Sequence, residues 1–403
     1  MRAIIIGAGI AGLVTARQLG LAGWHVDVVE QSPGPRDAGY MMDFFGPGVE
    51  ASERIGLYPR LVDLAYAVEA ATYVDSSYAV EAATYVDSSG KATARLDYER
   101  FARAAGGKVL TLLRPDMELA ALAALDDVPS GRLHLHYARR PTGYSDAGGT
   151  VAVDLAGTEP ARLEADVLIG ADGIHSAVRG ALFGPEERYL RPLGLRAAAY
   201  IAEEPALAAR LGRRFVLTDS LDRTVGLYGL RTGQVATFMV NRETGSPHAD
   251  DAPTRLRQDF AGLGPEVDRM LELCPPNPYD DVVAQMVMPT WHRERTVLVG
   301  DACSAVSLVA GQGGSLAIAG GALLGDLLGA IETPDQVPGA LAAFEGHWRP
   351  VIEDAQASGR RAIWMFLPHT RRQQRVRRWV LRAATLPVIN TIVARQIVKS
   401  IAS

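Results

Sequence analysis

Residues 2–31 contain the feature that most restricts the fold of this chain: a strand, a glycine-rich turn, a helix and a second strand in succession. The glycines of the turn are Gly7, Gly9 and Gly12. In such a unit the first allows a tight turn, the second lets the backbone approach a pyrophosphate, and the third lets helix and strand pack closely. Glu30 follows the second strand, where a carboxylate can accept hydrogen bonds from ribose hydroxyls. The segment predicts a dinucleotide-binding βαβ unit, although an ordinary βαβ unit with a tight turn shares the pattern.

Length and composition indicate a globular protein with more than one domain. The chain has 403 residues, of which 48% are hydrophobic and 22% charged. The formal net charge of −5 argues against general nucleic-acid binding. No apolar run is long enough for a membrane span, and the N-terminus lacks a basic leader and a cleavage site. Cys274 and Cys303 lack a CxxC partner, so we expect no disulfide framework, no metal site and a cytoplasmic location.

Basic residues gather at the end of the chain. From Arg360 onward there are nine arginines, one lysine and no carboxylate, so this segment carries +10 and the rest −15. The densest part is residues 371–382. Such a helix could touch an anionic membrane. We expect instead that its apolar face packs on the enzyme while its arginines face water.

The remaining patterns predict an α/β protein with a second, mainly antiparallel sheet. Residues 183–286 contain runs of alternating apolar and polar residues that are typical of such a sheet. Helical spacing returns in 314–331 and again near the end of the chain, with breaks at Pro368 and Pro387. The expected division is 1–182 and 287–340 for the two parts of a cofactor-binding domain, 183–286 for a substrate domain and 341–403 for C-terminal helices.

A tandem repeat interrupts the first domain. Residues 66–77 and 78–89 are identical. An even insertion preserves the two faces of a strand, so we expect one copy to fill a strand position while the other loops out or pairs beside it. A recent duplication without functional meaning is the simpler interpretation. The alternative hypothesis is that the extra residues line or obstruct a substrate entrance.

Two further loops follow apolar strands. Asp172-Gly173 comes after strand 165–169, and Gly300-Asp301 comes after strand 297–299. A glycine-rich stretch, 311–315, then opens the next predicted helix, whose N-terminal N–H groups can face an electron-rich group. Three such loops at strand ends of one chain suggest one long cofactor that touches all of them.

In these motifs the chain resembles the class A FAD-dependent monooxygenases, which include aromatic and polyketide hydroxylases and tetracycline-inactivating enzymes. Arg179 after the Asp-Gly loop, Arg36, and Arg114 in Arg-Pro-Asp also carry the resemblance. It implies a Rossmann-like FAD-binding domain of the p-hydroxybenzoate hydroxylase type (GR2), with the predicted sheet inserted as substrate domain. The FAD-binding residues that the resemblance implies are Gly7, Gly9, Ile10, Ala11, Gly12, Glu30, Gln31, Arg36, Arg114, Asp172, Gly173, Gly300, Asp301, Gly311, Gly313, Gly314 and Ser315.

The implied mechanism belongs to the cofactor. NAD(P)H, bound transiently, reduces FAD, O₂ adds at C4a, and the hydroperoxide delivers one oxygen atom to a bulky aromatic or polyketide-like small molecule. No side chain stands out as a catalytic acid or base. The family often has His-Pro after Gly-Asp-Ala, where this chain has Cys303-Ser304, and an Asn where it has Ser315. These departures concern the surface beside the flavin and the substrate.

Candidates for the substrate wall are apolar and aromatic residues of the predicted loops and strands, although such residues more often form plain core. They are Met42, Phe44, Phe215, Tyr228, Phe238 and Met239. His134 and His136 share a strand face, but no third ligand lies nearby, so a solvated face is expected rather than a metal site. His175 in the Asp-Gly loop is interpreted as a loop or capping residue rather than a base.

Several activities share these motifs. Ring hydroxylation is favoured, with Baeyer–Villiger oxygen insertion and antibiotic inactivation as variants of one chemistry. Another class is a flavin oxidoreductase without oxygen insertion, and a third is a non-catalytic FAD-binding protein. A halogenase is disfavoured because the five tryptophans are isolated in sequence and lysine is scarce. The sequence leaves the oligomeric state, monomer or homodimer, open.

Overall fold

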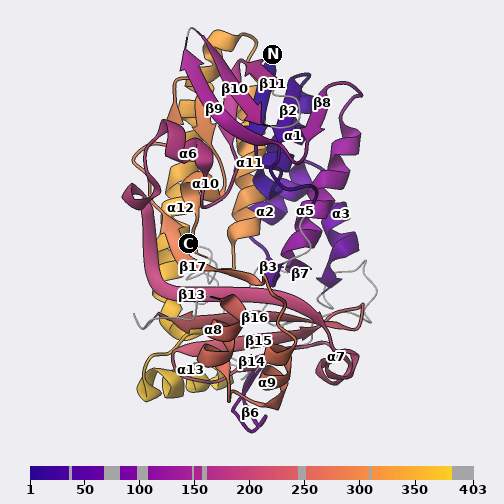
Figure 1. Cartoon of the computed structure of the whole chain (residues 1–403), viewed down its shortest axis with the longest axis vertical. Helices are drawn as coiled ribbons and strands as arrows, with labels where there is room; N and C mark the ends of the chain where they lie inside the picture. Colours follow the sequence, from indigo (N-terminus) through magenta and orange to yellow (C-terminus); the bar gives the residue numbers. More distant parts are fainter. Residues whose placement is uncertain are drawn as a thin grey trace.

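A computed structural model gives the fold of the chain (Figure 1). It describes residues 1–35, 39–67, 82–97, 108–147, 149–156, 161–243, 251–307 and 311–383. A six-stranded sheet with its helices forms one part, and a seven-stranded sheet crosses the other (Figure 1). The loops predicted to bind the cofactor follow strands of the six-stranded sheet.

The first sheet is parallel except at one edge, where a short strand pairs antiparallel. Its order is β18 (His292–Arg293), β19 (Thr296–Leu298), β12 (Val167–Gly170), β1 (Arg2–Ile6), β2 (His25–Val29) and β8 (Leu133–His136). Parallel strands are covered on both faces, which explains the continuous apolar runs. Ile4 and Ile5 on successive positions of β1 are both fully buried. The predicted Rossmann-like α/β core is confirmed.

Helices and a small sheet complete this part. The helices are α1 (Ile10–Leu21), α2 (Pro47–Arg54), α3 (Tyr58–Leu64), α5 (Arg114–Ala123), α6 (Ala177–Leu182), α10 (Asp301–Ser304) and α11 (Gly313–Gly329), with the short 3-10 turns η2 (Ala124–Asp127) and η3 (Glu186–Arg188). The antiparallel strands β9 (Arg140–Ala147), β10 (Thr150–Ala156) and β11 (Ala161–Ala165) connect β8 to β12. They place β9 beside the glycine loops.

The second large sheet is antiparallel except for one parallel pair, β14 with β5. Its order is β17 (Tyr279–Met286), β13 (Leu190–Glu203), β16 (Gln234–Arg242), β15 (Arg223–Gly229), β14 (Arg214–Thr218), β5 (Ala82–Val86) and β6 (Ala92–Asp97). One face packs on α7 (Pro205–Leu211), α8 (Ala252–Phe260) and α9 (Pro265–Glu272). The other packs on a three-stranded sheet of β3 (Met41–Phe44), β7 (Leu110–Leu113) and β4 (Tyr66–Ala67).

The described strands differ from the expected division at one place. Strands β5 and β6 belong to the seven-stranded sheet, although residues 82–97 fall inside the segment expected to be part of the cofactor domain. Both copies of the repeat supply a strand. The first copy supplies β4, which pairs with β7, and the second copy supplies β5, which pairs with β14. The intervening residues 68–81 lie outside the described residues. Pairing with β14 decided the position of β5, and local pattern does not report such a distant partner.

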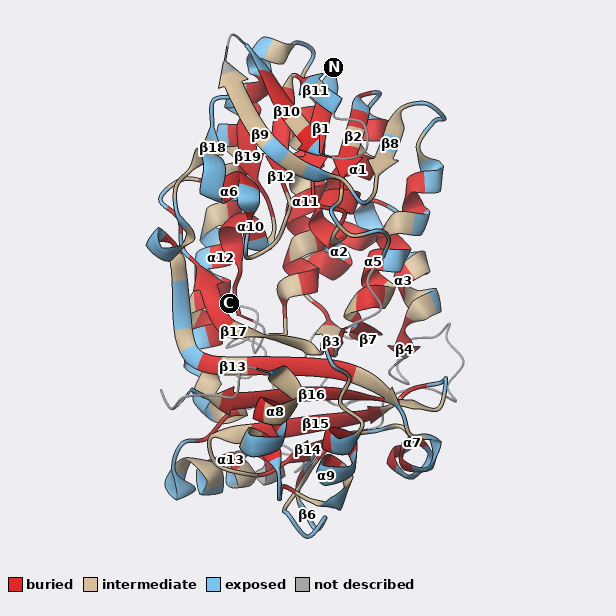
Figure 2. Cartoon of the chain, in the orientation of Figure 1, coloured by how far each residue is buried: buried red, intermediate tan, exposed pale blue. Residues whose placement is uncertain are grey.

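Two helices end the described chain, α12 (Val337–Phe366) and α13 (Arg371–Ala383). The break expected near Pro368 is confirmed, whereas Pro387 lies outside the described residues. Figure 2 shows that α13 is largely exposed or half-buried, in contrast to the buried interior of the six-stranded sheet. Among the described residues, no helix has both the length and the apolar character needed to traverse a bilayer.

Candidate cofactor site

The three predicted loops meet at one edge of the parallel sheet. Strands β19, β12 and β1 are neighbours, and each loop follows the carboxyl end of one of them. A Cβ at Gly300 would lie 3.0 Å from the methyl group of Ala11, and one at Gly7 would overlap the carbonyl of Ala171. The tertiary structure therefore brings together motifs that lie up to about 300 residues apart in the sequence.

The glycines of the first loop have different surroundings. Gly7 has φ +106°, and a Cβ at Gly12 would overlap the carbonyl of Gly7, so these positions need glycine for conformation or packing. A Cβ at Gly9 would have nothing within 4 Å. Gly9 is also the N-cap of α1, where unpaired N–H groups and the helix dipole favour an anion. The loop thus keeps open space where a pyrophosphate would approach the backbone.

A cavity of about 290 Å³ opens beside this loop. Its predicted lining residues are Gly7, Gly9, Glu30, Gln31, Arg114, Asp172 and Gly173. Arg140 and Tyr144 of β9 also line it. The Tyr144 hydroxyl is buried and has no hydrogen-bond partner in the described structure. A buried hydroxyl without a partner is costly, so it fits a polar ligand at this position.

Glu30 is held at the end of β2 by backbone groups. Its carboxylate accepts hydrogen bonds from the N–H of Ala8 at 3.0 Å and the N–H of Ser32 at 2.8 Å. Two bonds leave further lone pairs free, because a carboxylate has about four acceptor positions. The contact of Glu30 with a ribose stays a prediction.

Helices α1 and α11 run in the same direction, and their N-terminal ends are offset along the helix axis. A Cβ at Gly321 would meet the carbonyl of Ala11, and one at Gly325 would meet Gln18, so the helices run parallel in close contact. The hydroxyl of Thr15 also donates to the carbonyl of Gly321 at 3.2 Å. Since α11 begins eight residues before Gly321, its first turn extends about 12 Å beyond the level of Ala11. Two helix N-termini at this spacing suit a cofactor with a pyrophosphate and a distant ring.

The glycine-rich start of α11 combines an open position with packed ones. Gly311 has φ +66°, and a Cβ at Gly313 would have nothing within 4 Å. A Cβ at Gly314 would press on Met117 and Met42. The hydroxyl of Ser315 donates to the carbonyl of Phe45 at 2.6 Å and accepts from the N–H of Gly48 at 2.9 Å. Ser315 thus fixes the start of α11 against the β3–α2 loop.

Asp301 and the phenols of Tyr40 and Tyr279 all interact electrostatically with Arg114. Asp301 is exposed, whereas desolvation raises its pKa and Arg114 lowers it. Burial raises the pKa of Tyr40. The charge of Arg114 opposes this shift, and the charge of Asp301 adds to it. Burial also raises the pKa of Tyr279, with Tyr40 adding to the effect. Both phenols therefore stay protonated at neutral pH and can donate hydrogen bonds.

Asp172 and Arg179 organise the Asp-Gly loop. The Asp172 carboxylate accepts from Ser176 Oγ at 2.5 Å and from the N–H groups of Ala177 and Val178 at 2.7 and 3.1 Å, so it caps α6. Desolvation raises its pKa against these hydrogen bonds. Arg179 is fully buried and donates to the carbonyls of Ile174 at 2.7 Å and Ala302 at 2.9 Å. These contacts join the second loop to the third.

The six proposed substrate-wall residues are not brought together. Met42 and Phe44 lie in the core of the parallel sheet, and Met239 lies behind the second sheet, against its helices. Phe215 and Tyr228 stack on each other at 3.7 Å in a further cluster. Phe238 alone joins Tyr40, at 5.3 Å between ring centroids. Adjacent residues of a strand point to opposite faces, which separates Phe238 from Met239.

Sequence reasoning missed the polar and aromatic residues supplied by neighbouring strands. Tyr40 and Tyr279 carry no motif that distinguishes them; Tyr40 directly precedes β3, and its ring lies 6.2 Å from that of Tyr279. Tyr144 and Arg140 stand on a strand that carries no motif. Arg36 lies outside the described residues. Ile10 and Ala11 are buried in the first turn of α1 and do not line the cavity.

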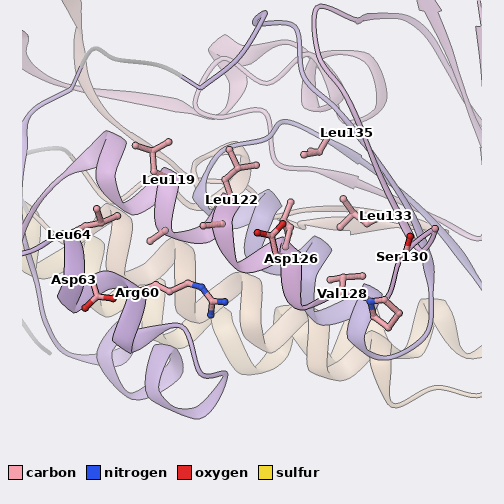
Figure 3. A pocket seen from close by; sticks show the side chains of 15 residues that line it. Arg60, Asp63, Leu64, Leu119, Leu122, Asp126, Val128, Ser130, Leu133 and Leu135 are labelled. Carbon is pink, nitrogen blue, oxygen red and sulfur yellow. The ribbon is translucent and has the colours of Figure 1, made fainter.

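A larger groove of about 840 Å³ lies elsewhere, on α3, α5 and β8. Figure 3 shows Leu119, Leu122, Leu133 and Leu135 around it, with Arg60 and Asp63 at its rim. It contains none of the predicted cofactor residues. The candidate site is therefore the smaller cavity at the glycine loops.

Comparisons with known proteins identify FAD-dependent relatives. A protein family described as FAD dependent oxidoreductase matches residues 2–142. An uncharacterized protein of Mycobacterium tuberculosis (strain ATCC 25618 / H37Rv) is 31% identical over 80% of this chain and 83% of its own length. A flavin-dependent monooxygenase from an unknown prokaryotic organism is 27% identical over 90% of this chain and 88% of its own.

Solved structures share the fold. That of the tetracycline destructase Tet(55) has a TM-score of 0.77 at 22% identity and covers 98% of this chain and 96% of that one. The glycine cradle, the unpartnered Tyr144 hydroxyl and the offset helix starts all fit FAD. The chain belongs to the class A flavin-dependent monooxygenases and is an FAD-dependent enzyme.

Proposed function

We propose that the chain uses NAD(P)H and O₂ to insert one oxygen atom into a bulky aromatic or polyketide-like small molecule, most simply by hydroxylation. Reduced FAD supplies the activation of dioxygen at its C4a position. Gly9 and the start of α1 would hold the pyrophosphate, and the first turn of α11 would face the ring. The observation that carries the proposal is the offset of these two helix starts, together with the contact of Tyr40 with Phe238.

A cluster of aromatic rings supports an aromatic substrate. The Tyr40 ring lies 5.3 Å from Phe238 and 6.2 Å from Tyr279, and Phe238 lies 6.2 Å from Phe366. These rings come from four separate elements or loops and converge beside Asp301 and Arg114. Aromatic walls bind planar rings and exclude water, which protects a reactive oxygen donor from side reactions. The protonated phenols of Tyr40 and Tyr279 would orient a polar substituent.

The test begins with the visible spectrum of the purified protein. We expect bound FAD, and NAD(P)H oxidation stimulated by at least one member of a panel of phenols, anthraquinones and tetracyclines. The product formed under ¹⁸O₂ should carry one labelled oxygen atom. A colourless, folded protein that refuses added FAD would contradict the cofactor assignment. Turnover with an unlabelled product would instead favour a flavin oxidoreductase that inserts no oxygen.

A further inference from the structure

Helix α13 departs from the expected arrangement on both of its faces. Its inward face carries Arg377, which is buried and bonded to Asp219 at 2.5 Å. Arg377 also donates to the carbonyl of Phe366 at 2.9 Å and lies 4.9 Å over the ring of Tyr85. Gln374, one turn earlier, donates to Asp219 at 3.1 Å. The expectation was right for Arg372 and Arg375, which are exposed, and for Leu381, which is buried. It did not foresee the buried Arg377, which the Asp219 carboxylate selects for the inward face.

Asp219 holds helix α13 against the sheet. It follows β14, and its carboxylate also accepts from Thr93 at 2.6 Å and from Arg378. Burial would raise its pKa, but these hydrogen bonds and the Arg377 charge outweigh burial and lower it. The charged anchor fixes the rotation of α13 about its axis. Consequently the opposite face of the helix has a defined orientation toward solvent.

That outer face combines cations with apolar side chains. Arg372, Arg375, Val376 and Trp379 follow the spacing i, i+3, i+4 and i+7 and are all exposed. Trp379 is 68% exposed and Val376 is 40% exposed. Trp379 has the highest exposed fraction among the large hydrophobic residues that the structure describes. Val376 and Trp379 lie one turn apart, so together they form an exposed apolar patch between arginines, the kind of surface that marks an interaction site.

The same face has no acidic neighbour in the described structure. Arg372 makes no ion pair there, and Arg375 donates only to the backbone carbonyl of Arg371, at 3.3 Å. No Asp or Glu occurs after Asp354, whereas the chain as a whole carries −5. The positive charge on this face is therefore concentrated and not compensated locally.

We propose that the outer face of α13, formed by Arg372, Arg375, Val376 and Trp379, docks on an anionic phospholipid surface. Arginines bind lipid phosphates, while an indole settles at the headgroup level and buries its ring. A folded acidic protein would complement the arginines but would also need a fitted pocket for Trp379. A lipid surface accepts the indole without such a pocket. Binding is peripheral, with the helix lying parallel to the surface.

The experiment uses the full chain loaded with FAD and vesicles of phosphatidylcholine alone or mixed with phosphatidylglycerol. We expect co-sedimentation with the mixed vesicles at low salt, little with phosphatidylcholine, and release by high salt. R372Q/R375Q should weaken binding about tenfold or more, since each cation near such a surface contributes about 1 kcal/mol. W379S should weaken binding while leaving its salt dependence in place.

Matched controls separate this face from general charge and exposure. R210Q/R269Q removes two exposed arginines from α7 and α9 of the same domain and should bind as the parent does. L119S removes an exposed leucine from α5 and should also have no effect. Thermal unfolding and FAD content verify each variant. The proposal would be overturned if the parent protein did not bind the mixed vesicles, or if the control variants lost as much vesicle binding as R372Q/R375Q and W379S. It would also be overturned if the parent preferred polyglutamate, the probe for an acidic protein, to the vesicles.

Discussion

Arg179 of the Asp-Gly loop donates a hydrogen bond to the carbonyl of Ala302 at 2.9 Å, directly after Asp301 of the Gly-Asp loop. The same guanidinium reaches the carbonyl of Ile174 and the carboxylate of Glu186. One fully buried side chain thus connects two of the three loops at the candidate FAD site. Its role is positioning, because it acts through the loops it holds.

Replacement of Arg179 by Gln should weaken both the fold and FAD binding. Each buried carbonyl left without its donor costs about 1–3 kcal/mol. We expect a lower melting temperature and a higher Kd for FAD, measured by flavin fluorescence. R191Q is the control, because Arg191 is exposed and donates to the nearby backbone carbonyls of Leu190 and Arg188. Unchanged FAD affinity in R179Q would argue against this positioning role.

Substitutions at Gly9 and Gly12 should have separable effects. Gly9 has φ −79° and ψ 178°, which any residue adopts, and its Cβ position is open. Gly9→Val should therefore fold normally as apoprotein and lose FAD affinity by about tenfold or more, because the side chain occupies the pyrophosphate position. Gly12→Ala should destabilise the apoprotein by about 1–3 kcal/mol through overlap with Gly7. Tight FAD binding by Gly9→Val would refute the placement.

His175 should make the stability of the enzyme depend on pH. Its ring nitrogens lie 2.9 Å from Glu186 and 3.0 Å from Asp281, so it joins the Asp-Gly loop to β17. Burial opposes its protonation, but the two carboxylates outweigh burial and raise its pKa. A raised pKa contributes stability that is complete below the unfolded value of about 6.5 and is lost as pH rises through the folded value.

The check is to measure the melting temperature of the parent and of H175Q from mildly acidic to alkaline pH. The difference in favour of the parent should be largest in mildly acidic buffer and should disappear in alkaline buffer. A difference that stays constant with pH would show that protonated His175 makes no such contribution. His347, whose ring bonds to the backbone carbonyl of Ala343 on its own helix, supplies the control variant H347Q.

Deletion of residues 78–89 should leave the sheets intact and alter catalysis. Because the two copies are identical, the shortened chain keeps Tyr-Ala for β4 and Ala-Ala-Thr-Tyr-Val for β5, separated by two residues. Tyr66 and Ala83 already share one core cluster, so a short connection is compatible with the fold. If the insertion lines the substrate entrance, substrate range or KM changes. Unchanged kinetics with normal FAD content would refute that hypothesis.

The sequence alone predicted the βαβ unit and the order of the three loops. Gly7, Gly9 and Gly12 could be interpreted without a structure, because their conformational and packing demands are local. The family resemblance added the implied FAD contacts at Arg114 and Asp301. Helix spacing also placed α11 to within two residues of its observed bounds.

Only the tertiary structure decided which side chains share a space. Tyr40, Phe238, Tyr279 and Phe366 meet from distant elements, and nothing in their local patterns distinguishes them from core residues. Asp219 likewise decided which face of α13 is turned inward, although it lies 158 residues from Arg377 in the sequence. The reason is physical: local pattern encodes backbone conformation, whereas burial and charge compensation depend on partners that only folding brings near.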